Sequence, residues 1–262
     1  MREIFIAVGM VSALGLLAGV ILTVAARFFA VPTDETAEKI TAVLPGANCG
    51  GCGYSGCSGY AEAVAKGLAA PNRCAVGGNA VAEEIGKILG VEVTAAERKV
   101  AALRCKGDCN ATRKRFQYEG ILTCAAANLV HGGDAACSFG CLGYGDCAAA
   151  CEFGAITLKD GLPHPDTARC TACGQCVKAC PRHLMTLRPI SKTQIVACSS
   201  TEKGGPQRKV CTAGCIGCSK CTTVCETGAV TVENNLAKID WEKCSGCGKC
   251  ADICPVHCIE TY

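Results

Sequence analysis

Residues 170–181 read Cys-Thr-Ala-Cys-Gly-Gln-Cys-Val-Lys-Ala-Cys-Pro, and residues 244–255 repeat the same cysteine and proline positions as Cys-Ser-Gly-Cys-Gly-Lys-Cys-Ala-Asp-Ile-Cys-Pro. Cysteines separated by two residues readily act as neighbouring ligands of one metal centre. A run of four with this spacing binds one iron–sulfur cluster through three cysteines and a second cluster through the fourth. Each run therefore requires a partner run elsewhere in the chain.

Two further groups of cysteines supply these partners. Residues 215–225 hold a run of four without the final proline, and residues 137–151 hold a stretched run with spacings of three, five and three residues. The chain thus contains an internal repeat. We expect two bacterial-ferredoxin-like modules, at residues 137–190 and 211–262, joined by a linker at 191–210.

The exchange of the fourth cysteine predicts four ligand sets. They are Cys137, Cys141, Cys147 with Cys180; Cys170, Cys173, Cys176 with Cys151; Cys215, Cys218, Cys221 with Cys254; and Cys244, Cys247, Cys250 with Cys225. Zinc also binds pairs of this spacing, but a zinc site closes with four ligands and needs neither a third step nor Cys-Pro. The pattern favours [4Fe-4S] clusters.

A fifth group lies nearer the N-terminus, where residues 48–53 read Asn-Cys-Gly-Gly-Cys-Gly. It supplies the four thiols Cys49, Cys52, Cys57 and Cys74. The glycines allow backbone N–H groups to approach the sulfurs and tune a reduction potential. We expect a small helical domain at residues 34–95 with a fifth cluster, and a structural zinc site is the alternative.

Six of the 26 cysteines remain. We expect a sixth cluster held by Cys105, Cys109, Cys124 and Cys198, with Cys211 as the substitute fourth ligand. This set would use the connecting segment at residues 96–136. Cys258 is expected to be a buried free thiol, since cysteine packs well as a small hydrophobic residue.

The N-terminus predicts a membrane anchor. From Ile4 to Ala26 there are 23 residues without a charge, enough for a helix of roughly 34 Å. A cleaved signal peptide is the competing interpretation, but this apolar run exceeds the usual length. We assign residues 1–33 to a transmembrane helix and linker. Arg2 and Arg27 flank the span and do not orient it.

Composition and charge exclude other classes. The chain has 262 residues, half of them hydrophobic, and a net charge of +3 without a long basic run, so nucleic acid is not an expected partner. We find neither a dinucleotide fingerprint nor a phosphate-binding loop. Arg113, Lys114 and Arg115 form a short basic run that could dock an acidic protein.

The order of these features resembles that of the B-type subunits of the Rnf ion-translocating ferredoxin:NAD oxidoreductases. The most specific stretches are residues 48–57 and 137–151. The resemblance implies a subunit that accepts electrons from soluble ferredoxin and relays them to partner subunits, which reduce NAD and move Na⁺ or H⁺. It also implies a single-pass protein of the inner (plasma) membrane with its other domains on the cytoplasmic side. The absence of a twin-arginine export signal agrees with that side.

The sequence thus predicts an α+β protein with one N-terminal transmembrane helix, a small helical [4Fe-4S] domain and two ferredoxin-like modules carrying two clusters each. Five clusters are expected, and six if the remaining cysteines hold one. Two other functional classes remain open at this point. One is a self-contained enzyme with a specialised catalytic cluster, and the other is a membrane-tethered zinc-binding interaction module.

Overall fold

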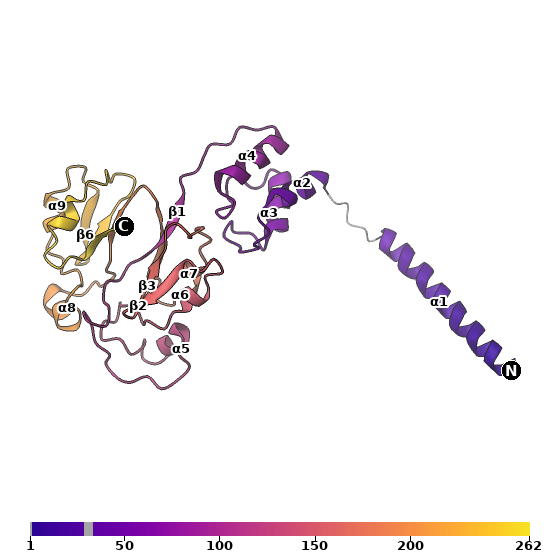
Figure 1. The fold of residues 1–262 in the computed structure, drawn as a ribbon, viewed down its shortest axis with the longest axis horizontal. Helices are drawn as coiled ribbons and strands as arrows, with labels where there is room; N and C mark the ends of the chain where they lie inside the picture. Colours follow the sequence, from indigo (N-terminus) through magenta and orange to yellow (C-terminus); the bar gives the residue numbers. More distant parts are fainter. Residues whose placement is uncertain (1, 29–33) are drawn as a thin grey trace.

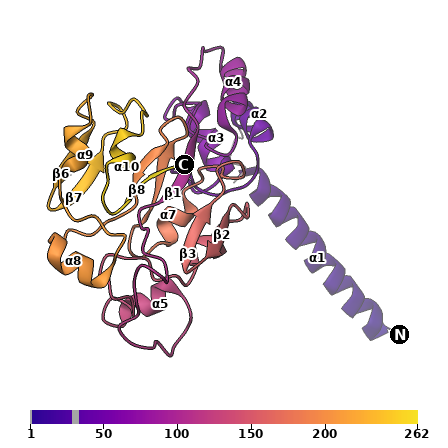
Figure 2. The ribbon, with the colours of Figure 1, turned by 60° about the vertical axis from the view of Figure 1, so that its left-hand side comes forward.

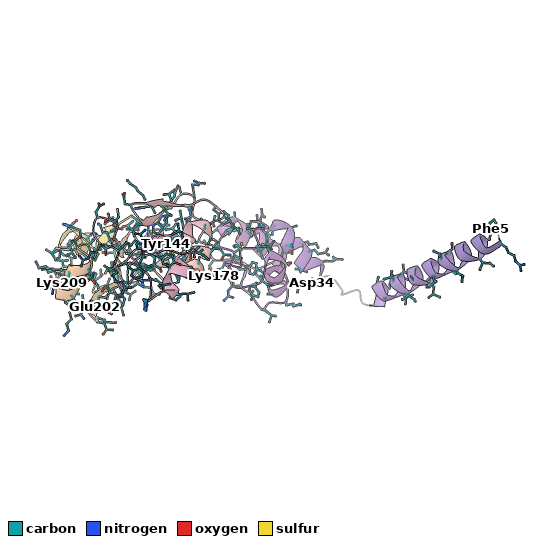
Figure 3. The ribbon with its side chains drawn as sticks, turned by 90° about the horizontal axis from the view of Figure 1, so that it is seen from below. Phe5, Asp34, Tyr144, Lys178, Glu202 and Lys209 are labelled. Carbon is teal, nitrogen blue, oxygen red and sulfur yellow. The ribbon has the colours of Figure 1, made fainter. Side chains whose placement is uncertain are left out.

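The computed structural model describes residues 2–28 and 34–262 (Figure 1). Helix α1 (Arg2–Phe28) contains an apolar stretch, Gly9–Arg27, with a mean hydropathy of 2.2 and no residue buried inside the chain. Its side chains project outward on all sides (Figure 3). Among the described residues it is the one helix long and apolar enough to cross a membrane. Most of the expected linker after it, residues 29–33, lies outside the described part.

Three helices form the helical domain, and their bounds are α2 (Glu35–Val43), α3 (Cys57–Ala65) and α4 (Gly78–Leu89). The carboxylate of Asp34 accepts a hydrogen bond from the backbone N–H of Thr36 and caps α2. Ile40, Tyr60 and Ile85, one from each helix, are fully buried against one another. This apolar contact holds together the loops that carry four cysteines.

Residues 99–189 form module 1. Its elements are β1 (Lys99–Leu103), α5 (Cys124–Leu129), α6 (Asp146–Ala149), β2 (Ile156–Lys159), β3 (Leu162–Pro165), α7 (Gln175–Ala179) and β4 (Met185–Pro189). Strand β1 pairs with β4 antiparallel, and β2 pairs with β3. The turn between β2 and β3 consists of Asp160 and Gly161, both with positive φ, as in the tight hairpin turns that match strand twist.

Residues 194–261 form module 2, which repeats this arrangement. Its elements are β5 (Gln194–Val196), α8 (Gly204–Val210), α9 (Lys220–Thr223), β6 (Val230–Glu233), β7 (Leu236–Ile239), α10 (Lys249–Asp252) and β8 (Ile259–Thr261). Strand β5 pairs with β8, and β6 pairs with β7 through a turn of Asn234 and Asn235, again with positive φ. Each module buries its apolar residues and cysteines in its own core.

The modules are larger than the cysteine pattern predicts. Strand β1 falls in the segment 96–136, which we expected to be a connection, and β5 falls in the expected linker 191–210. Each strand pairs with the last strand of its module, and this pairing encloses the cysteine runs between them. The two modules lie side by side in both views (Figures 1 and 2). Lys192 joins them by donating to the carbonyl oxygen of Cys244 at 2.7 Å.

Candidate metal centres

All 26 cysteines lie in the described residues, and none forms a disulfide. Four of them occupy the second position of a short helix, namely Cys147, Cys176, Cys221 and Cys250 in α6, α7, α9 and α10. The residue before each helix has a left-handed backbone conformation, with φ between 59 and 86°. Three of these residues are glycines, which adopt that conformation without steric cost. The turn wraps the preceding cysteines around the start of the helix.

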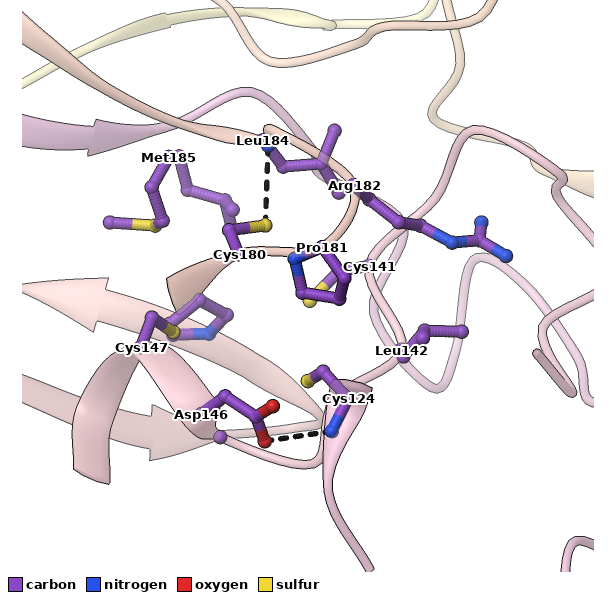
Figure 4. Close-up of a pocket in the computed structure, with 13 residues that line it drawn as sticks. Cys124, Cys141, Leu142, Asp146, Cys147, Cys180, Pro181, Arg182, Leu184 and Met185 are labelled. Atoms are coloured by element: carbon purple, nitrogen blue, oxygen red, sulfur yellow. Dashed lines mark hydrogen bonds between the residues drawn. The ribbon is translucent and has the colours of Figure 1, made fainter. Parts of the chain in front are cut away.

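Site C is a cavity of about 380 Å³ in module 1 (Figure 4). The cysteines that line it are Cys124, Cys141, Cys147 and Cys180. The carboxylate of Asp146 accepts a hydrogen bond from the backbone N–H of Cys124 at 2.7 Å and so fixes Cys124 beside the α6 cysteine. The sulfur of Cys180 accepts a hydrogen bond from the backbone N–H of Leu184 at 3.3 Å.

The sequence-based grouping differs from the structure here, because it places Cys137 where Cys124 is found. The repeat contains a signal that explains the difference. Residues 74 positions apart correspond throughout the cysteine runs, as Cys141 and Cys215 do, and Tyr144 then corresponds to Cys218. Module 1 therefore lacks the middle cysteine of its first run, and Cys124 from α5 supplies the fourth sulfur instead.

Site B is a cavity of about 330 Å³ on the other side of module 1. Its cysteines are those expected from the sequence, namely Cys151, Cys170, Cys173 and Cys176. The sulfurs of Cys151 and Cys170 accept hydrogen bonds from the backbone N–H groups of Ala155 and Ala101, both at 3.3 Å. The second of these donors lies in β1, so the strand outside the expected module boundary contributes to the site.

Site E is a cavity of about 310 Å³ in module 2. It is lined by Cys215, Cys218, Cys221 and Cys254, as expected, and also by Cys258. Cys258 is only 1% exposed, and its sulfur lies 3.6 Å from that of Cys254. A hydrogen bond from Cys258 holds the pKa of the Cys215 thiol below its usual value.

Site F comprises the remaining cysteines of module 2, Cys225, Cys244, Cys247 and Cys250. Burial, with the nearby charges of Cys244, Cys247 and Cys225, raises the pKa of the Cys250 thiol. The sulfur of Cys244 accepts a hydrogen bond from the backbone N–H of Gly246 at 3.4 Å. The four thiols predicted as one ligand set therefore lie within electrostatic reach of one another.

Site A, in the helical domain, comprises Cys49, Cys52, Cys57 and Cys74. The side chain of Asn48 accepts a hydrogen bond from the backbone N–H of Cys57 at 2.8 Å, which holds the loop against the start of α3. Tyr60 donates to the carbonyl oxygen of Ala70 and so fixes the segment that leads to Cys74. Burial, with the charges of the other three cysteines of the site, raises the pKa of the Cys74 thiol.

Site D is a cavity of about 310 Å³ where modules 1 and 2 meet. It is lined by Cys105, Cys137, Cys198 and Cys211. Our expected sixth set shares only Cys105 and Cys198 with it, because Cys124 lines site C and Cys109 is exposed at the surface. Cys211, expected only as a substitute, lines the cavity directly.

The sites suit a cluster better than a single ion. Among the described residues, no group of three or more His, Cys, Asp or Glu side chains could hold one metal ion, as a zinc site requires. Burial raises the pKa of Cys105, Cys141 and Cys147 to about 12, and that of Cys176 and Cys221 to about 11. Buried thiols of this kind need a positively charged partner before they ionise. Four thiols around a cavity, with backbone N–H groups aimed at the sulfurs, fit an iron–sulfur cluster.

Sites A and B meet at a close backbone contact. A Cβ on Gly51 would lie 2.7 Å from the carbonyl oxygen of Cys173, so glycine is needed for this approach. The side-chain amide of Gln175 donates to the carbonyl oxygen of Cys49 at 2.5 Å. Lys178, at the boundary between the two domains in Figure 3, lies beside Gly50. Ligand loops of the two sites therefore touch.

The basic run at residues 113–115 is largely engaged within the chain. Lys114 forms an ion pair with Asp134 at 2.8 Å, and Arg115 donates to the carbonyl oxygens of His131 and Gly133. These contacts tie the run to the loop that precedes Cys137. Arg113 is exposed.

Three protein-family models match this chain. The first, described as a putative Fe-S cluster, covers residues 44–76 and therefore site A. A 4Fe-4S dicluster domain matches residues 169–229, and a 4Fe-4S binding domain matches residues 237–260. The dicluster match spans the second half of module 1 and the first half of module 2. The chain thus carries multiple iron–sulfur clusters.

Curated relatives, all B-type subunits of their complexes, align over nearly the whole chain. That of the Na⁺-translocating ferredoxin:NAD⁺ oxidoreductase complex of Acetobacterium woodii is 44% identical over 260 residues, which is 99% of this chain and 78% of the relative. That of an ion-translocating oxidoreductase complex of Methanosarcina acetivorans is 41% identical, over 97% of this chain and 96% of the relative. That of the proton-translocating ferredoxin:NAD⁺ oxidoreductase complex of Clostridium ljungdahlii is 42% identical, over 92% and 85%.

Proposed function

Because this chain belongs to the family of B-type subunits of the Rnf ion-translocating ferredoxin:NAD⁺ oxidoreductase complexes, we propose that it relays electrons from reduced ferredoxin, through module 2 and module 1, to its helical domain. The family resemblance noted in the sequence is confirmed by identities of 41–44% over nearly the full chain. The chain is the iron–sulfur subunit of a complex that translocates Na⁺ or H⁺. Its route for electrons is the part that we infer.

The observation that carries this proposal is the contact between Gly51 and Cys173. It joins a ligand loop of the helical domain to a ligand loop of module 1, with Gln175 and Cys49 bonded across the same boundary. Iron–sulfur clusters supply one-electron transfer when bound, with potentials set by hydrogen bonds to sulfur and by solvent exposure. The protein's part is to hold neighbouring ligand loops in direct contact.

We assign [4Fe-4S] clusters to sites A, B, C, E and F, in an α+β fold of two bacterial-ferredoxin-like modules behind the helical domain. Sites A, B, E and F keep the ligands expected from sequence. Site C takes Cys124 in place of Cys137. The lining of each cavity and the hydrogen bonds to its sulfurs support these assignments.

Electrons enter at module 2 in this proposal. Cys218 of site E and Cys247 of site F are exposed, whereas most other cluster cysteines are buried or half-buried. Exposure of a ligand allows a donor protein to approach the bound cluster closely. Lys220 and Lys249 flank these two cysteines and suit an acidic ferredoxin. Arg113 offers a second docking position on module 1.

Helix α1 anchors the chain in this proposal as a single pass through the inner (plasma) membrane, with the helical domain and modules on the cytoplasmic side. Its length, hydropathy and exposure support the anchor. The cytosolic loading of iron–sulfur clusters and the soluble donor support the side. The helical domain follows the anchor directly in sequence, which suits it as the exit to membrane-embedded partner subunits.

Mixing experiments test the proposed route. The full chain is loaded with iron and sulfide anaerobically in detergent and mixed with reduced ferredoxin, while its visible absorption is followed. We expect bleaching by ferredoxin, slowed at low salt by Lys220→Ala more than by Arg113→Ala. If dithionite bleaches the protein but ferredoxin does not, the chain is not the ferredoxin acceptor. A stronger effect of Arg113→Ala would move the entry point to module 1.

A further inference from the structure

We propose that site D holds a sixth iron–sulfur cluster, with Cys105, Cys137, Cys198 and Cys211 as its ligands, which bridges the two modules. The inference rests on the proposed iron–sulfur loading of this chain but not on its electron donor. Its cavity matches that of site E in volume, about 310 Å³ in each. Both cavities are lined by four or more cysteines, so both suit the same guest.

The internal repeat provides an independent argument. Cys137 and Cys211 correspond to each other, since each lies four residues before the first cysteine of a run, Cys141 or Cys215. Site D therefore takes one extra cysteine from the same position of each module. Such a pairing predicts a site built symmetrically across the module interface.

The other two ligands obey the same symmetry. Strand β1 ends at Leu103 and β5 ends at Val196, and these residues pair with Met185 and Ile259 at corresponding positions of the last strands. Cys105 and Cys198 each follow two residues later. All four cysteines of site D thus form two equivalent pairs, although they are spread over more than a hundred residues of sequence.

Hydrogen bonds at site D resemble those at the motif sites. The sulfur of Cys105 accepts the backbone N–H of Cys141 at 3.4 Å, and the sulfur of Cys198 accepts those of Ser200 and Cys215 at 3.5 and 3.2 Å. Sulfurs of sites B and C accept backbone N–H groups at 3.3 Å in the same way. Such donors stabilise ligating thiolates and tune a cluster.

A buried side chain also indicates a guest. Gln207 lines the cavity, is 1% exposed, and has no hydrogen-bond partner for either its Nε2 or its Oε1 atom. A buried amide without partners is costly, and a fully unpaired one in a native protein calls for a bound partner. The sulfur atoms of a bound cluster would provide an acceptor for the Nε2 donor.

The location of site D explains its use. Cys141, which donates to Cys105, is a ligand of site C, and Cys215, which donates to Cys198, is a ligand of site E. Site D thus contacts one ligand of each module through a single hydrogen bond. It converts two separate pairs of clusters into one continuous series from module 2 to the helical domain.

Iron counting on the full chain, loaded anaerobically, is the first test. We expect about 24 irons per chain from six four-iron clusters, and about 20 would overturn the proposal. Ferredoxin would still bleach a five-cluster protein, so this failure is distinct from failure of the proposed function. Cys109→Ala, which removes the exposed thiol outside the cavity, is the matched control and should leave the count unchanged.

Double variants then test which cysteines share a site. Cys105→Ala and Cys137→Ala should each lower the count by about four irons, and the double variant should lose no more than either alone. Cys124→Ala combined with Cys137→Ala should lose about eight irons, because these residues belong to different sites. Additive loss in the first pair, or non-additive loss in the second, would overturn the ligand set. Serine variants at the same positions, checked by circular dichroism, repeat the comparison with a smaller change of volume.

Discussion

The carboxylate of Asp146 accepts hydrogen bonds from the backbone N–H groups of Cys124 and Ala125, at 2.7 and 2.9 Å. These donors belong to the first turn of α5, whose N–H groups have no partner within the helix. Asp146 itself begins α6, which carries Cys147. One side chain therefore fixes the distance between two cysteines of site C that lie 23 residues apart in the sequence.

Removing this carboxylate should release Cys124 from the site. We expect Asp146→Ala to lower the free energy of unfolding by about 1–3 kcal/mol and to reduce iron at site C, with Asp146→Asn intermediate because it keeps one acceptor oxygen. Iron content and thermal unfolding measure the two effects. Asp34→Ala is the matched control, since it removes a comparable cap from α2, which carries no cysteine. Equal iron loss in both variants would contradict the positioning role.

Sequence spacing alone predicts the cysteines of sites A, B, E and F, because their ligands lie in compact runs. It misassigns Cys124 and Cys137 because the stretched run of module 1 has as many cysteines as a complete one. The decisive residue is Tyr144, which stands where the repeat requires a cysteine. Its hydroxyl donates to Asp134 at 2.8 Å and its ring packs against Tyr118, so the position has acquired a structural use.

The outer strands are the part of the fold that sequence patterns do not reveal. Strand β1 has four successive buried residues after Lys99 and lacks the alternation of a half-exposed strand. It pairs with β4, more than 80 residues later, and the pairing brings Cys105 toward Cys137. Such long-range contacts leave no local signal, and site D depends on them.

A side chain at position 51 should separate the helical domain from module 1. The Cβ of Gly51→Ala would lie 2.7 Å from the carbonyl oxygen of Cys173, and overpacking of this kind costs roughly 1–3 kcal/mol. We expect slower reduction of site A by ferredoxin, followed by its EPR signal after rapid freezing, with an unchanged iron count. Gly205→Ala is the control, because a Cβ there meets nothing within 4 Å. Unchanged reduction of site A would show that electrons do not cross at this contact.

Arg182 holds the loop that carries Cys137. Its guanidinium donates to the carbonyl oxygens of Cys137, Ser138 and Gly140 at 3.1, 2.6 and 2.9 Å, and burial lowers its pKa. We expect Arg182→Ala to destabilise the protein by about 1.5–3 kcal/mol, because charged donors to several carbonyls are lost. Arg182→Lys should recover only part of this, since an ammonium cannot reproduce the planar fork.

Thermal unfolding of the loaded protein measures the effect of Arg182. The control is Arg208→Ala, which removes an exposed arginine from α8. The loop loosened in the Arg182 variants carries a ligand of site D and precedes Cys141 of site C, so iron should be lost from these two sites first. Loss confined to module 2 would contradict this assignment.

Cys258 should tune site E without holding its cluster. It corresponds in the repeat to Leu184, which lines site C without any ligating group, so the position does not require a thiol for assembly. Its thiol nevertheless donates to the sulfur of Cys215. A hydrogen bond to a ligating sulfur draws electron density from it and favours the reduced cluster. We therefore expect Cys258→Ala to keep the full iron count and to make the reduction potential of site E more negative.

An EPR redox titration of the loaded full chain measures this shift. Leu184→Cys is the reciprocal variant, because it introduces a thiol at the same position of module 1, and it should move the potential of site C in the positive direction. Opposite shifts at the two sites would assign the effect to the thiol, since a change in packing alone has no reason to reverse its sign between the modules. A loss of about four irons from Cys258→Ala would instead make Cys258 a ligand of site E.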